Sequence, residues 1–207
     1  MRTISRLHLA VCGAALALFA VEPSATLFEN DQVKVARALE KAHVKGGFHE
    51  HKPNRVMVYL QAGKQRFEYQ DGRQPKVFDW KPGQVVWSRA EGMHSPEVVG
   101  DDPFNIIEVE LKNPGSKTPS SSQNPATIDA KHFTSEIEND QVRVVRLKLG
   151  PHESTPMFTN DFPQVVVFLT DRGTHKAGEA IWAKAGSRKE ENQSDKPVEL
   201  VIVEVKN

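Results

Sequence analysis

Three histidines of this 207-residue chain have a spacing that suits metal chemistry. His49 and His51 are separated by Glu50, and His94 follows 43 positions after His51. Alternate side chains of a β-strand point to one face, so the first two imidazoles can reach the same ion while Glu50 points away. A third imidazole from a distant strand would complete a facial set around a divalent ion and leave positions open for water, oxygen or substrate. The alternative is a chance pair in an exposed loop.

The segments that must position these histidines have the pattern of β-strands. The apolar runs are short, β-branched and alternating, and no segment of ten or more residues has a convincing helical period. Asp71-Gly72 is a hairpin-turn signal between two such runs. In the run 107–111 the apolar side chains are expected to face inward, and Glu108 and Glu110 to face water. The predicted fold class is therefore all-β, with strands spaced as in a sandwich or barrel.

The chain contains two copies of one unit. The segment 28–37 (FENDQVKVAR) reappears as 137–146 (IENDQVRVVR), at an offset of 109 residues. The same comparison places 82–87 opposite 177–182, and 107–112 opposite 202–206. We expect an N-terminal domain, 26–112, and a C-terminal domain, 127–207, joined by the Pro/Ser-rich linker 113–126. The second copy is shorter because it lacks most of one hairpin.

The second copy has lost the candidate metal ligands. Phe158 and Asn160 stand opposite the histidine pair, and Lys189 stands opposite His94. Nothing in that copy would hold an ion, so we expect it to act as a packing partner. It would cover a strand edge or an apolar face of the first copy, as a second subunit does in a dimer.

Four other histidines of the two copies are not expected to bind a metal. His43 and His152 occupy the same place in both copies, which favours hydrogen-bonded strand residues. His132 and His175 have no companion at ligand spacing and are interpreted as surface residues.

The segment 28–112 resembles a cupin, a small jelly-roll β-barrel. The first cupin motif, a glycine, His-x-His and a strand ending in glycine, is matched by Gly46, His49, His51 and Gly63. The second motif, Pro-x-Gly with a later histidine, is approximated by Pro82-Gly83 and His94, with Asn105 at a slightly displaced asparagine position. The first copy is particularly similar to small single-domain cupins, some of them assigned to β-alanine degradation. The resemblance implies two jelly-roll barrels in tandem, the second shortened and degenerate.

The sequence departs from the cupin pattern at one position. Where most metal-binding cupins have a glutamate ligand four residues after the second histidine, this chain has Arg55. A cation beside a divalent metal is unfavourable, so Arg55 should point away, pair with an acidic group or meet an anionic ligand. We hypothesise that Arg55 binds a substrate carboxylate, with Tyr69 and Trp87 in the same pocket. The alternatives are a surface ion pair for Arg55 and ordinary core packing for the aromatic residues.

The composition excludes several function classes. The chain has 27 basic and 27 acidic side chains, so nucleic acid is not an expected partner. A single cysteine, Cys12, excludes a disulfide framework and a cysteine-based zinc cluster, and any metal must be held by histidine or carboxylate. Cys12 lies in the N-terminal apolar segment, where a lipoprotein anchor is an alternative.

The first 25 residues have the pattern of a secretory signal peptide. Arg2 and Arg6 precede the apolar stretch 7–21, which is shorter than the ~20 residues of a membrane-spanning helix. Cleavage is expected after Ala20 or Ala25. The predicted mature protein is periplasmic or secreted and is not associated with a membrane.

Three functions are compatible with these patterns. The first is an exported bicupin that binds one divalent metal (Fe, Mn, Ni, Cu or Zn) and acts as a dioxygenase-like or isomerase-like enzyme on a small carboxylate or phenolic substrate. The second is a non-enzymatic module that binds a small ligand, and the third is a structural protein. The protein is expected to be a monomer with an intramolecular barrel pair, or a homodimer.

Overall fold

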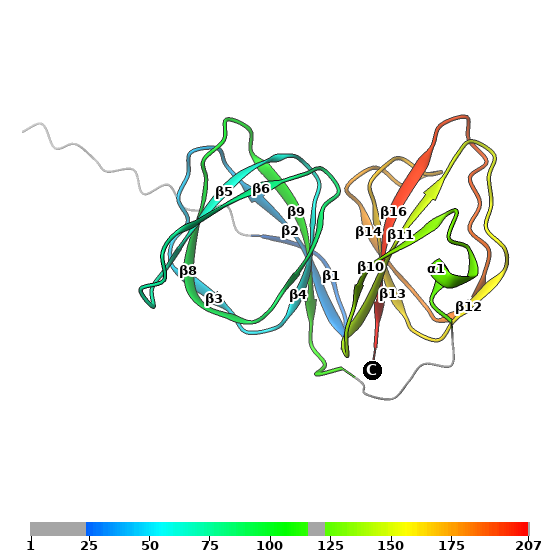
Figure 1. Ribbon diagram of the computed structural model, residues 1–207, viewed down its shortest axis with the longest axis horizontal. Helices are drawn as coiled ribbons and strands as arrows, with labels where there is room; N and C mark the ends of the chain where they lie inside the picture. The colour runs from blue at the N-terminus through cyan, green and yellow to red at the C-terminus, as the bar shows by residue number, and fades with distance from the viewer. Residues whose placement is uncertain (1–23, 116–122, 207) are drawn as a thin grey trace, which may run out of the picture.

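The computed structural model describes residues 24–115 and 123–206. The predicted signal peptide, apart from Ser24 and Ala25, and the linker residues 116–122 lie outside the described residues. Strands dominate the described part of the chain, which confirms the all-β prediction. Figure 1 shows two β-rich halves side by side, coloured blue to green and green to red. No helix in the described residues is long and apolar enough to cross a membrane.

The first half consists of two facing sheets. One sheet has five strands in the order β1-β2-β9-β4-β7, and the other has four in the order β3-β8-β5-β6. The strands are β1 (Ala25–Glu29), β2 (Val33–Glu40), β3 (His49–His51), β4 (Arg55–Tyr59), β5 (Gly63–Tyr69), β6 (Lys76–Trp80), β7 (Val85–Ser88), β8 (Glu91–Val98) and β9 (Phe104–Leu111).

The second half repeats the larger sheet and shortens the smaller one. Its five-stranded sheet has the corresponding order β10-β11-β16-β13-β14, and its second sheet has two strands, β12 and β15. The elements are α1 (Pro125–Ile128), β10 (Phe133–Glu138), β11 (Val142–Leu149), β12 (Phe158–Asn160), β13 (Gln164–Phe168), β14 (Ala180–Ala183), β15 (Gly186–Arg188) and β16 (Val198–Val205). In the described residues, no strand corresponds to the β5–β6 hairpin. The helix α1 takes in the last two residues of the predicted linker.

One predicted correspondence between the copies is wrong by one residue. Glu110 on β9 pairs with Lys34 on β2. In the second half, Glu204 on β16 pairs with Arg143 on β11. Lys34 and Arg143 are matched by the offset of 109, so Glu110 and Glu204 are matched too. The offset between β9 and β16 is therefore 94 residues, whereas placing Ile107 opposite Ile202 implies 95. The correction matters because a shift of one residue moves every side chain of a strand to the other face.

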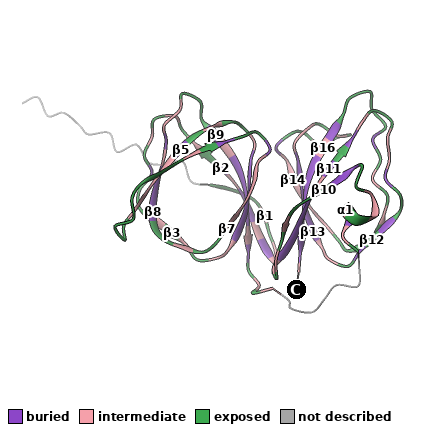
Figure 2. Ribbon diagram, in the orientation of Figure 1, coloured by how far each residue is buried: buried purple, intermediate pink, exposed green. Residues whose placement is uncertain are grey.

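The two halves pack through a valine-rich core between their five-stranded sheets. Both halves contribute buried side chains to it, namely Val33, Val35, Val56, Val58, Ile107, Val109, Leu111, Val142, Val144, Val165, Val167, Val201, Val203 and Val205. Figure 2 shows buried residues along the strands where the halves meet. The second half thus covers an apolar face of the first, as predicted. The run 107–111 turns its apolar side chains toward the other half, and the prediction that Glu108 faces water is wrong, since Glu108 is 7% exposed.

Matching polar contacts flank this core on both sides. The Arg37 guanidinium donates to the carbonyl of Gly178. Its counterpart Arg146 donates from Nη2 to the carbonyl of Gly83 over 2.6 Å. Arg37 and Arg146 are matched by the offset of 109, and the two glycines by the predicted alignment. The contacts are therefore reciprocal, as in an isologous dimer interface.

The interiors of the two halves differ. The second half is filled by an apolar cluster that includes Phe133, Leu147, Phe158 and Phe168, against which α1 packs. The first half has a smaller cluster, which leaves space beside the histidines.

Three of these four other histidines differ from expectation. His43 and His152 lie in turns, each with a φ of 57°, rather than on strands. Each donates from Nε2 to an aspartate carboxylate, His43 to Asp101 and His152 to Asp195. His132 is buried rather than at the surface, because the carboxylate of Asp129 holds its Nδ1 at 2.6 Å.

Candidate metal and ligand site

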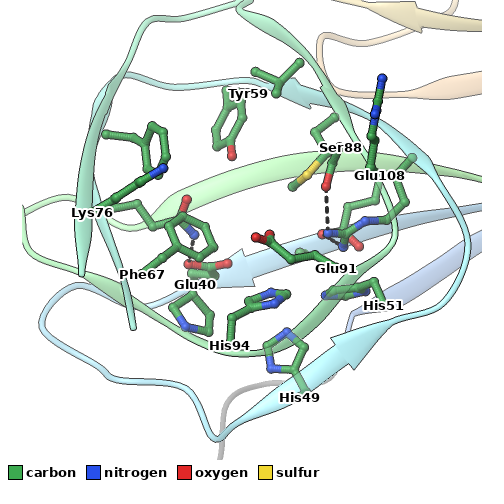
Figure 3. Close-up of a pocket in the computed structure, with 18 of the residues that line it drawn as sticks. Glu40, His49, His51, Tyr59, Phe67, Lys76, Ser88, Glu91, His94 and Glu108 are labelled. Carbon is green, nitrogen blue, oxygen red and sulfur yellow. Dashed lines mark hydrogen bonds and ion pairs between the residues drawn. The ribbon is translucent and has the colours of Figure 1, made fainter. Parts of the chain in front are cut away.

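The smaller sheet of the first half brings the three histidines together. His49 and His51 lie on β3, and His94 lies on β8, directly opposite His49 in the antiparallel pairing. A β-bulge between His49 and His51 shifts the register, so that Glu91 is opposite His51. The alternation of β3 turns both of its histidines to the face that His94 shares (Figure 3).

The three imidazoles converge, and those of His49 and His94 have their Nε2 atoms available. One nitrogen from each ring lies within 4.8 Å of the others, and the centroids of the rings of His49 and His94 are 4.8 Å apart. His49 Nδ1 is 2.9 Å from the carbonyl of Gly47, and His94 Nδ1 is 3.0 Å from that of Gly92. A carbonyl only accepts, so both Nδ1 atoms carry the proton and both Nε2 atoms keep a lone pair. Backbone carbonyls commonly orient metal-binding histidines in this way.

The surroundings of His51 and His94 favour the neutral form of the imidazole. Burial lowers the pKa of His94. Burial also lowers the pKa of His51 to about 3, together with the positive charge of Arg55 and the two neighbouring imidazoles. Neutral imidazole is the form that binds a metal. The donor set therefore fits a divalent transition metal.

Arg55 forms a buried ion pair rather than the surface pair considered above. Its Nη1 donates to Glu108 Oε1 over 3.4 Å, and its Nη2 donates to Ser88 Oγ over 3.2 Å. Arg55 is 4% exposed. Burial raises the pKa of Glu108, and the guanidinium acts against that rise. In the second half the corresponding positions hold Gln164 and Ile202, so this ion pair has no counterpart at those two positions.

A second carboxyl group, Glu40 at the end of β2, faces the same space. Gln65 Nε2 donates to Glu40 Oε2 over 2.6 Å, and Trp80 Nε1 donates to Gln65 Oε1 over 3.0 Å. Burial raises the pKa of Glu40 to about 7, while the bond from Gln65 opposes the rise. The offset of 109 places Leu149 at this position in the second half. Glu40 can therefore hold or release a proton near neutral pH.

All of these groups line one cavity of about 640 Å³. The three predicted substrate-binding residues also line it, but in different ways. Arg55 is tied to its carboxylate partner, and Tyr69 lies opposite His94 with the Arg73 guanidinium 3.9 Å from its ring centre. Trp87 packs mainly against the core between the two halves.

Sequence reasoning missed Glu40, Gln65 and Glu108 as cavity residues. The signal was present in the internal repeat, because Glu40 and Glu108 replace apolar residues of the second copy. It could be used for Glu108 only after the one-residue error in the alignment was corrected.

The second half has no comparable cluster in its described residues. Phe158 on β12 pairs with Arg188 on β15, so the counterpart of His94 is Arg188 and not the predicted Lys189. Arg188 donates to Gln164, and Asn160 is 2% exposed. These side chains offer no three nitrogen or oxygen ligands at one point.

Comparison with known proteins identifies the architecture. No family model matches the sequence, and no curated protein matches it. The solved structure of AerE from Microcystis aeruginosa is similar with a TM-score of 0.62 and 15% identity, over 89% of this chain and 97% of that one. A variant of oxalate decarboxylase from Bacillus subtilis gives a TM-score of 0.64 and 10% identity, over 88% and 72%. A cupin domain from Bordetella pertussis matches 44% of this chain at 21% identity, with a TM-score of 0.41. At these identities the likeness concerns the fold.

Proposed function

We propose that this chain, which has the cupin fold, binds one divalent transition metal through His49, His51 and His94 and holds a small anionic ligand in the adjoining cavity. One observation carries the proposal. The two Nδ1 atoms that are bonded to backbone carbonyls leave Nε2 lone pairs directed to one point beside a cavity. An exported location is part of the proposal and rests on the N-terminal sequence pattern alone.

The metal would be iron, manganese, nickel, copper or zinc, because imidazole nitrogen accepts all of these ions. When bound, such an ion supplies Lewis-acid or redox chemistry to an oxygen-containing ligand. The chain contributes the remaining groups. Glu40 can hold or release a proton near neutral pH, and aromatic side chains such as Phe67 and Trp80 line the cavity beside it. Arg55 keeps a positive charge near the ligand space while Glu108 compensates it.

The reaction that we propose is a dioxygenase-like or isomerase-like conversion of a small carboxylate or phenolic compound. The similar structure from Bacillus subtilis is an oxalate decarboxylase, so at least one protein of this fold acts on a small carboxylate. A non-enzymatic ligand-binding protein is the second candidate. The observation that favours it is that Arg55, paired with Glu108, stands where most metal-binding cupins have a glutamate ligand.

Metal analysis of the mature chain tests the site. We expect about one equivalent of a first-row transition metal in protein that starts at residue 26. His49→Ala and His94→Ala should each lower this content at least tenfold. The matched control is His43→Ala, an exposed histidine of the same half, which should leave the content unchanged. A wild-type protein that takes up no metal when these ions are added would contradict the proposal.

Oxygen uptake separates the enzyme from the binding protein. Metal-loaded protein is incubated with carboxylate and phenolic compounds, and oxygen consumption and product formation are followed. Turnover that disappears in His94→Ala supports the enzyme. Saturable binding without any turnover supports the non-enzymatic candidate.

A further inference from the structure

The cavity beside the histidines is larger than a metal site needs. Its volume of about 640 Å³ lies in the range of sites that enclose drug-sized ligands. A two-carbon acid would occupy a small part of it. The shape and chemistry of the remaining wall therefore carry information about the ligand.

An uninterrupted row of aromatic rings runs along this wall from the metal site inward. The ring centre of His94 is 5.7 Å from that of Phe67, which is 5.6 Å from Phe78. Phe78 stacks on Trp80 at 5.0 Å, and Trp80 stacks on Tyr59 at 4.2 Å. Figure 3 shows Phe67 and Tyr59 directed toward the space above the histidines. These rings give the cavity an aromatic, apolar lining, against which another aromatic ring can pack edge-to-face or stacked.

The aromatic wall is confined to the half that carries the histidines. Phe67, Phe78 and Trp80 lie on β5 and β6, which have no counterpart among the described residues of the second half. The second half fills its interior with its own apolar cluster instead. Because that half has the same larger sheet without this hairpin, the fold does not require the wall.

Two cations at the cavity lining complete the pattern. Lys76 and Arg89 are exposed, and within residues 24–115 and 123–206 neither has an ion-pair partner. Arg73, by contrast, is already paired with Asp71 and Glu91. Unpaired cations at the entrance of a cavity attract anions. A ligand that satisfies both the wall and the entrance is flat, apolar in its body and negatively charged.

We propose that the cavity binds an aromatic carboxylate, with its ring against Phe67 and Phe78 and its oxygen donors directed toward the histidines. This inference rests on the proposed metal function and narrows its ligand class. It differs from a site for a short aliphatic acid, which would use the metal and the cations but gain nothing from the aromatic wall.

Calorimetric titration of the metal-loaded mature protein tests this assignment without an activity assay. The probes are salicylate, its saturated analogue cis-2-hydroxycyclohexanecarboxylate, and oxalate. We expect salicylate to bind at least tenfold more tightly than the saturated analogue. Phe78→Leu should weaken salicylate about tenfold while metal content and oxalate binding stay unchanged. Val77→Ala is the matched control, since Val77 is the 60% exposed neighbour on the same strand.

The outcomes separate the two proposals. Equal affinity for salicylate and the saturated analogue, or a Phe78→Leu protein that binds salicylate as well as the wild type, would overturn the aromatic assignment while the metal function stood. If the wild type held no metal, the metal function would fail. The same titrations on metal-free protein would then measure the contribution of the aromatic wall alone. If that protein bound salicylate no more tightly than the saturated analogue, the aromatic assignment would be overturned as well.

Discussion

Replacing Glu40 by glutamine should stabilise the metal-free protein in alkaline solution and change it little in acid. Burial raises the pKa of this carboxyl group from its ordinary 4.5 to about 7. The folded protein therefore retains a proton that the unfolded chain has already lost between these two values. Glutamine keeps an oxygen that can accept the bond from Gln65 and never needs to ionise.

The sign and size of the effect follow from the raised pKa. A carboxyl group with a higher pKa in the folded state favours folding most below pH 4.5, and that contribution is lost as the pH rises through about 7. Each unit of pKa corresponds to about 1.4 kcal/mol, so the full cost of Glu40 above pH 7 is about 3 kcal/mol. This is an upper bound, because water can enter the cavity and screen the charge. We expect Glu40→Gln to gain about 1–3 kcal/mol at pH 8.5 relative to its effect at pH 5.

Urea unfolding at these two pH values, in the presence of a chelator, measures the difference. Glu50→Gln is the control, because Glu50 lies on β3 with an exposed side chain. That variant should change the free energy of unfolding by less than about 0.5 kcal/mol at either pH. A Glu40→Gln protein whose stability shifts by the same amount at pH 5 and pH 8.5 would refute the reasoning about the buried carboxyl group.

Two further predictions concern packing. Glu108→Ala should destabilise the metal-free protein by about 3–5 kcal/mol in urea unfolding because it leaves Arg55 buried and unpaired, whereas Arg55→Met combined with Glu108→Leu should recover most of that loss. A double variant as unstable as the single one would contradict this account. Gly83→Ala should cost more than Gly72→Ala by about 1–2 kcal/mol in thermal or urea unfolding. Both glycines have positive φ, but only at Gly83 would a β-carbon meet neighbours, Leu169 at 3.0 Å and Arg146 at 3.2 Å. Equal costs would show that the interface can yield at that point.

The fold class and the metal triad could be predicted because the information is local or repeated. His49 and His51 share a face on any strand. The repeated sequence of residues 28–37 and 137–146 identifies equivalent strands in the two halves, whatever those strands pack against. The resemblance to cupins supported the choice of His94, since its distance along the chain alone fixes no contact. The structure brings all three together.

The interior carboxyl groups could not be predicted because alternation shows which residues share a face and not what covers that face. Ile107 and Val109 were expected to face the barrel interior, but the second half covers their face, and Glu108 faces the interior instead. The apolar and polar faces of β9 are both buried. His132 was misplaced for a related reason, because its burial depends on a carboxylate brought to it by a short helix.

The reciprocal interface between the halves has a consequence for how the protein can change. In a homodimer every substitution occurs twice. Substitutions that create a polar cavity in one subunit therefore create the same cavity in the other. Here the pairing is intramolecular, and a linker of this length holds the halves at an effective concentration independent of how much protein is present. Each change in one half therefore occurs once. One barrel can keep a hollow interior lined by histidines and carboxyl groups at a cost in stability, while the other holds an apolar cluster in its interior and supports the first.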